Sequence, residues 1–173
     1  VGDRSARQRL VCGILRHLPT SLEELDLSSD GCLGTPPPDI VVPTTNLRRI
    51  KFGYGNLWHM IPLLKNSPLL EEVSIGDMLD SELIEIISSH CPGIHSIHFY
   101  LGASQPQIIP SAFKGLRSIR LKVPNAIAVE RADFMTLLSQ HTNTLEHLFL
   151  TQTIDDIGRN LGNILRTFPN LRS

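Results

Sequence analysis

The sequence has few cysteines, no long apolar run and no excess of either charge. Its three cysteines, Cys12, Cys32 and Cys91, are odd in number and widely spaced, unlike a secreted disulfide framework. No apolar stretch approaches the ~20 residues that span a bilayer. With 16 basic and 17 acidic residues, the net charge of -1 gives no general attraction to nucleic acid or to an anionic membrane. We therefore expect a cytosolic or nuclear protein that binds neither nucleic acid nor membrane.

An internal repeat occupies almost the whole sequence. The pattern is an apolar residue, two variable residues, an apolar residue, one variable residue and a further apolar residue. Its copies are LEELDL at 22–27, LRRIKF at 47–52, LEEVSI at 70–75, IHSIHF at 94–99, LRSIRL at 116–121 and LEHLFL at 145–150. A seventh copy begins at Leu171 and is cut off after Ser173. The copies start 22 to 29 residues apart, and leucine-rich repeats have this length and this LxxLxL core.

The repeat predicts alternating strands and helices. Each copy ends in alternating apolar and variable residues, which is typical of a short strand with one buried face. We expect strands near 24–27, 49–52, 72–75, 96–99, 118–121 and 147–150. Amphipathic segments predict helices at 4–18, 57–66, 81–90, 130–141 and 156–167, with Pro62 confined to a first turn or a kink. Prolines make segments 35–43 and 103–115 irregular.

Strands that alternate with helices form parallel sheets, and one repeat cannot bury its apolar face without its neighbours. The predicted fold is therefore an α/β leucine-rich-repeat solenoid, a right-handed superhelix with a parallel concave sheet and outer helices. Residues 1–173 form one domain of about six complete repeats and a truncated seventh. The cut seventh repeat and the initial valine lead us to expect an excerpt of a longer chain.

Three segments place a helix end and a proline before the repeat: NSPLLEEVSI at 66–75, HCPGIHSIHF at 90–99 and FPNLRS at 168–173. This layout resembles the ribonuclease-inhibitor-like leucine-rich repeats of F-box proteins, in which a Cys-Pro-x-Leu-x-x-Leu element is typical. The nearest match is Cys91-Pro92-Gly93-Ile94. The sequence departs from regular extracellular repeats because the asparagine position after each strand holds Asp30, Gly55, Met78, Gly102, Pro124 and Thr153. It is more similar to fungal or plant intracellular F-box proteins.

The resemblance implies a protein–protein interaction domain that recognises substrates for an F-box-type ubiquitin ligase. The other components of such an SCF-type ligase would attach through an F-box upstream of this sequence, which itself contains none. Two alternatives stay open. The chain is a leucine-rich-repeat scaffold or regulator unrelated to ubiquitin, for example of a small GTPase, or it is an accessory repeat domain of a larger enzyme. The upstream sequence would distinguish the three.

Nothing in the sequence predicts an enzyme, a metal site or a cofactor. His90, His95 and His98 surround Cys91, as in some zinc sites, but His95 and His98 are three residues apart on a strand and point to opposite sides. Cys91 is better interpreted as a small buried residue at the corner between helix and strand. No glycine-rich phosphate loop and no oriented base for a cysteine nucleophile are present.

The candidate site is the concave face, which carries the variable strand residues. On neighbouring predicted strands, the acidic group Glu23, Glu24 and Asp26 and the basic group Arg48, Arg49 and Lys51 are expected to neutralise each other. Phe149 is an apolar ring on a solvated face, where the fold does not require one. Arg120 has no acidic neighbour among the concave positions of the adjacent strands. The predicted contacts for a protein or peptide partner are therefore His98, Tyr100, Arg120, Lys122, His147 and Phe149.

Overall fold

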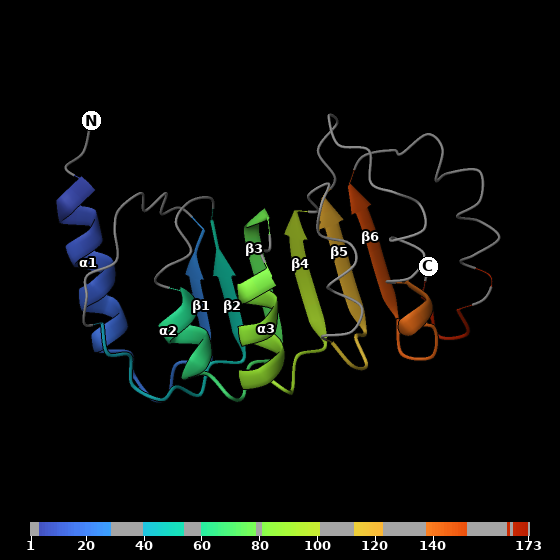
Figure 1. Cartoon of the computed structure of the whole chain (residues 1–173), viewed down its shortest axis with the longest axis horizontal. Coiled ribbons are helices and arrows are strands. Elements are labelled where there is room, and N and C mark those ends of the chain that lie inside the picture. The colour runs from blue at the N-terminus through green and yellow to red at the C-terminus, as the bar shows by residue number, and fades with distance from the viewer. Residues whose placement is uncertain are drawn as a thin grey trace.

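The computed structural model describes residues 4–28, 40–53, 60–78, 81–100, 113–122, 138–151, 166 and 168–172. Its centre is a six-stranded sheet in which every strand pairs in parallel with the next strand along the chain (Figure 1). The strands are β1 (Glu24–Leu27), β2 (Arg49–Phe52), β3 (Glu72–Met78), β4 (Ser96–Tyr100), β5 (Ser118–Lys122) and β6 (His147–Thr151). The six predicted strands and their sequential parallel order are confirmed.

The buried face of the sheet is built from equivalent positions of the repeat. The first column, in register across the sheet, is Leu25, Ile50, Val73, Ile97, Ile119 and Leu148. The four central members are at most 2% exposed, whereas Leu25 and Leu148 at the two ends are only partly buried. Each central residue has a neighbouring strand on both sides, and each end residue has one. The equivalent apolar positions therefore form one column, and its centre carries most of the burial.

The helices whose bounds lie within the described residues are α1 (Arg4–Arg16), α2 (Met60–Lys65) and α3 (Ser81–His90). In Figure 1, α1 stands at the β1 end of the sheet, and α2 and α3 lie on one face of it. Pro62 is in the first turn of α2, where its missing N–H removes no helical hydrogen bond. The apolar side chains of α2 and α3 join those of the strands in one continuous core. The sheet therefore has one covered face.

The predicted first helix differs from the structure, and other predicted segments are not tested by it. The helix expected over 4–18 ends at Arg16, and only part of its apolar set is buried. Leu10 and Ile14 are 65% and 39% exposed, because one side of α1 packs on the core and these residues form a second stripe away from it. The irregular segments 35–43 and 103–115 and the helices 130–141 and 156–167 lie largely outside the described residues.

One backbone hydrogen bond recurs just before each strand from β2 to β6. The amide at the second position of each repeat donates to the carbonyl at the equivalent position of the preceding repeat, at 2.8–3.0 Å. The participating residues are Glu23, Arg48, Glu71, His95, Arg117, Glu146 and Arg172. The bond from Arg172 to Glu146 extends this arrangement to the copy that begins at Leu171. The backbone thus repeats as regularly as the sequence pattern does.

The chain makes a close approach where β1 and β2 end. A Cβ atom on Gly53 would lie 2.2 Å from the carbonyl oxygen of Ser28. A Cβ atom on Gly76, which lies within β3, would in turn meet the backbone of Gly53 at 3.1 Å. Gly53 is therefore required for close stacking of neighbouring repeats.

Candidate functional site

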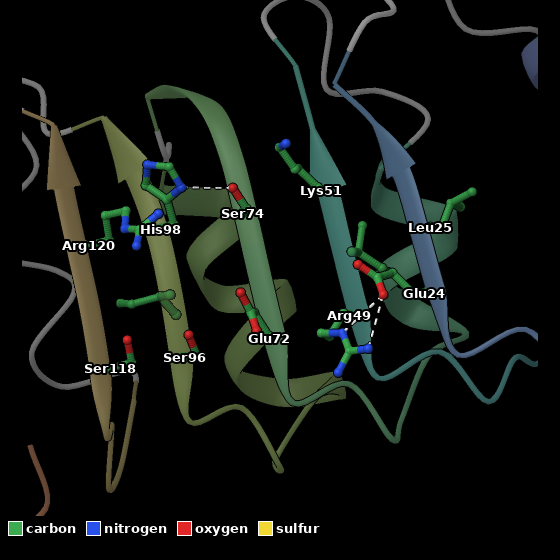
Figure 2. Close-up of a pocket in the computed structure, with 12 residues that line it drawn as sticks. Glu24, Leu25, Arg49, Lys51, Glu72, Ser74, Ser96, His98, Ser118 and Arg120 are labelled. Atoms are coloured by element: carbon green, nitrogen blue, oxygen red, sulfur yellow. Dashed lines mark hydrogen bonds and ion pairs between the residues drawn. The ribbon is translucent and has the colours of Figure 1, made fainter. Parts of the chain in front are cut away.

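The candidate site lies on the other face of the sheet, here called the open face, where the variable strand residues project. A groove of about 310 Å³ crosses it over β1 to β5 (Figure 2). Its polar lining consists of Glu24, Arg49, Lys51, Glu72, Ser74, Ser96, His98, Ser118 and Arg120. Parallel alternation brings these residues together because every second side chain of each strand points to the same face. Among the candidate residues, His98 and Arg120 line this groove.

The β1–β2 part of the open face is neutralised by ion pairs. Arg49 donates from Nη2 to Glu24 at 3.0 Å, and Lys51 Nζ lies 3.3 Å from Asp26 (Figure 2 shows the first pair). The pKa of Arg49 is raised by Glu24, and that of Asp26 is lowered first by hydrogen bonds from Ser28 and then by Lys51. The predicted charge compensation between the first two strands is confirmed.

Charged residues also alternate along the edge where the strands begin. Arg48 pairs with Glu71 of the next repeat, and Arg117 and Arg172 lie 3.9 and 3.3 Å from Glu146. The expected pairing of Arg48 with the acidic residues of the first strand is wrong, because Arg48 pairs with Glu71. Its position precedes the strand, so its side chain reaches the edge of the sheet and the repeat that follows.

The centre of the groove contains small hydroxyl residues and one imidazole. His98 Nδ1 and Ser74 Oγ are 2.9 Å apart across β3 and β4. Glu72, Ser96 and Ser118 form a second row in register across β3, β4 and β5, two residues before Ser74 and His98. The sequence places these residues on the face, but the candidate set omitted Glu72 and all three serines. The signal for the hollow is a group of short side chains: Ser96 and Ser118 occupy equivalent positions of β4 and β5, and Ser74 is in register with His98, two residues further along. Short side chains leave space between longer ones.

The β5–β6 part of the open face carries a stack of a cation and two rings. The guanidinium carbon of Arg120 lies 4.6 Å from the ring centroid of Phe149, which is a cation–π distance. His147 stacks on Phe149 with ring centroids 6.3 Å apart and planes 17° apart. Phe149 is still 46% exposed. Arg120 forms no ion pair with any residue in the described part of the chain, so its packing surface is the ring.

The two remaining candidate residues are Tyr100 and Lys122. Tyr100 and Lys122 are in register on β4 and β5, at the ends where these strands finish. Tyr100 is partly buried. The side chain of Lys122 lies outside the described residues. The six predicted partner contacts are therefore on neighbouring strands, and their role in binding stays a prediction.

The corners that precede the strands bury polar groups with very different environments. Thr45 and Ser67 share a hydrogen bond of 2.8 Å between their hydroxyls. Cys91 is 1% exposed, its thiol donates to the carbonyl of Leu64 at 3.4 Å, and burial raises its pKa to about 12. His141 is 1% exposed, its ring nitrogens have no hydrogen-bond partner among the described residues, and burial lowers its pKa. The interpretation of Cys91 as a buried corner residue is confirmed.

Among the described residues, no three histidine, cysteine or acidic side chains lie together as a metal would require. His95 instead faces Glu71 at 3.9 Å on the edge of the sheet, apart from His98 in the groove. No described helix combines the length and apolar character needed to cross a membrane. Comparisons of the chain with protein-family models, characterised proteins and solved structures found no match.

Proposed function

We propose that this chain is a leucine-rich-repeat solenoid whose open face is concave and binds a protein or peptide partner. The fold-level support is the sequential parallel sheet, in which one LxxLxL copy supplies each strand and the same backbone hydrogen bond links each repeat to the next. The helices occupy one face of the sheet and leave the polar groove on the other. Repeat proteins bind partners through such extended surfaces.

The observation that carries the proposal is the stack of Arg120, Phe149 and His147. The phenyl ring of Phe149 is 46% exposed, so much of its apolar surface stays in contact with water. A polar side chain at this position would not have that cost. Aromatic and arginine side chains are the usual anchors of protein interfaces. Six strands about 4.8 Å apart extend over roughly 24 Å, which suits a peptide or the edge of a protein.

We further propose that the partner is a substrate of an F-box-type ubiquitin ligase and that the protein acts in the cytosol or nucleus. This assignment rests on the resemblance of the Cys91-Pro92 corner and its repeat to those of F-box proteins. An F-box upstream of the repeats, together with co-purification of the ligase scaffold, would support it. If the full-length protein has no F-box and no ligase scaffold co-purifies with it, the ubiquitin assignment is wrong. The proposed binding function would not be affected.

The binding function can be tested by quantitative affinity purification of the full-length protein from cells that express it. Arg120→Ala and Phe149→Ala are compared with Glu85→Ala, a change on the exposed side of α3. We expect both open-face variants to lose the partner that wild-type protein and the helix variant retain. If the helix variant loses it while both open-face variants keep it, the open face is not the binding surface.

A further inference from the structure

Within the part of the chain that the structure describes, two opposite charges of the groove, Glu72 and Arg120, have no ion-pair partner. Glu72 forms no ion pair with another described residue and contributes only a longer-range attraction to Arg49, which is already bonded to Glu24. Arg120 packs on Phe149 and has no carboxylate within ion-pair distance in the described parts of the chain. The groove is therefore bipolar, with an acidic group on β3 and a basic group on β5.

The space between these two groups is open. Ser96 and Ser118, in register with Glu72, have short side chains and no side-chain hydrogen bond to another described residue. Arg120 is two residues beyond Ser118 on β5, beside His98 of β4 (Figure 2). Two strand spacings and two residues of rise separate the Cα atoms of Glu72 and Arg120 by about 12 Å.

We propose that the groove binds an extended peptide segment with an acidic side chain at Arg120 and a basic side chain at Glu72. The proposal rests on the proposed protein-binding function and names the partner's chemistry. A guanidinium supported by a ring keeps its N–H groups for a carboxylate, with which it can form paired hydrogen bonds. An isolated small anion would leave Glu72 unmatched, and a polyanion would be repelled by it.

The separation of the two charges predicts their spacing in the peptide. An extended chain advances about 3.3 Å per residue and shows every second side chain to the same side. A gap of about 12 Å therefore corresponds to an acidic and a basic residue about four positions apart. The hydroxyls of Ser96 and Ser118 lie between them, where the peptide backbone would pass.

The test begins with a display library of random 12-residue peptides selected on the whole chain. We expect enrichment of peptides with one acidic and one basic residue about four positions apart. A selected peptide should bind Arg120→Glu at least about ten-fold more weakly, because an ionic hydrogen bond is replaced by repulsion. Changing the acidic residue of that peptide to lysine should then restore binding to Arg120→Glu and weaken binding to the wild type.

Matched variants separate a local effect from misfolding. Arg117→Glu changes an exposed arginine at the edge of the sheet and should keep the affinity for the selected peptide. Arg120→Gln removes the charge without repulsion and should lie between wild type and Arg120→Glu. Thermal melting checks that every variant is folded. Equal loss in Arg117→Glu and Arg120→Glu would overturn the proposal.

The library also distinguishes this inference from the proposed function. Failure to enrich any peptide, or enrichment without the paired charges, overturns the bipolar groove. If Arg120→Ala and Phe149→Ala still lose the cellular partner in that case, the open face binds proteins by another chemistry. If those variants keep the partner as well, both proposals fail.

Discussion

The two ends of the sheet satisfy their polar groups to different degrees. On β1 and β2, Arg49 and Lys51 are each bound to a carboxylate of the neighbouring strand, and the buried hydroxyls behind them, on Thr45 and Ser67, bond each other. On β5 and β6, Arg120 contacts a ring instead of a carboxylate, and the buried His141 has no hydrogen-bond partner among the described residues.

This difference shows how one repeat pattern can support two roles. Exposed ion pairs are screened by water and contribute little to stability, but they leave no group that a partner must satisfy. An unmatched guanidinium on an exposed ring is already held in place and gains a partner only on binding. The charges of β1 and β2 therefore satisfy each other, whereas β3 to β6 form the candidate contact region.

The largest effect is expected in the core that both ends share. Val73→Ala or Ile97→Ala should lower the free energy of unfolding by about 1–3 kcal/mol, because lost apolar burial and a cavity both destabilise. Leu25→Ala and Leu148→Ala should cost less, since these end residues are only partly buried. Chemical denaturation measures all four, and an equal loss at the ends and the centre would contradict the comparison.

The next effect distinguishes the two ends by binding. Phe149→Ala should weaken partner binding about ten-fold or more, as truncation of an aromatic anchor does. Lys51→Ala at the other end should change it little, because that cation is already paired. Titration calorimetry with the purified partner provides both values. A larger loss in Lys51→Ala would assign the contact region to the wrong end.

A pH titration compares the buried corners. Burial lowers the pKa of His141 below its ordinary value of 6.5, so the unfolded state binds the proton more readily. The stability that depends on neutral His141 is complete above about pH 6.5 and falls as the pH drops below it. Wild-type protein should thus lose more stability on acidification than His141→Leu.

The matched control for this titration is His90→Gln, which changes an exposed histidine at the end of α3. Urea denaturation at about pH 7.5 and 5.5 measures the loss for each protein. We expect His90→Gln to lose as much stability as the wild type. Equal losses in wild type and His141→Leu would show that His141 is not the responsible group.

The smallest effect concerns salt. A double-mutant cycle on the free energy of unfolding should give a coupling energy of about 0.5–1 kcal/mol between Arg120 and Phe149. This coupling should persist in concentrated NaCl, since the contact is largely packing of a cation on a ring. The corresponding cycle for Lys51 and Asp26 should give a small coupling that salt removes. If the couplings respond to salt in the opposite way, the distinction between paired and stacked ends is wrong.

Much of the fold could be predicted because its elements repeat a local pattern. Each LxxLxL copy specifies a strand, and equal offsets within the copies align Ile50, Val73 and Ile97 in one column. Pairing of Arg49 and Lys51 with β1 followed from the same register. The pattern also placed Phe149 and Arg120 on one face, although it does not specify that the two side chains touch.

The remaining features depend on contacts that the repeat does not encode. Arg48 has acidic residues at the equivalent position on both sides, and only the side-chain direction selects Glu71. The exposure of Leu10 depends on which side of α1 meets the core. The groove depends on the short side chains of Ser74, Ser96 and Ser118 lying together, which becomes informative once the register is known.

The most direct test of partner binding by the open face is site-specific photocrosslinking of the full-length protein in cells. A photoreactive phenylalanine analogue replaces Phe149 in one variant and Glu85 on α3 in another, and adducts are identified by mass spectrometry. If the open face binds the partner, a specific protein adduct forms at position 149, Arg120→Ala weakens it, and none forms at position 85. An adduct that forms at position 85 and not at position 149 would contradict it.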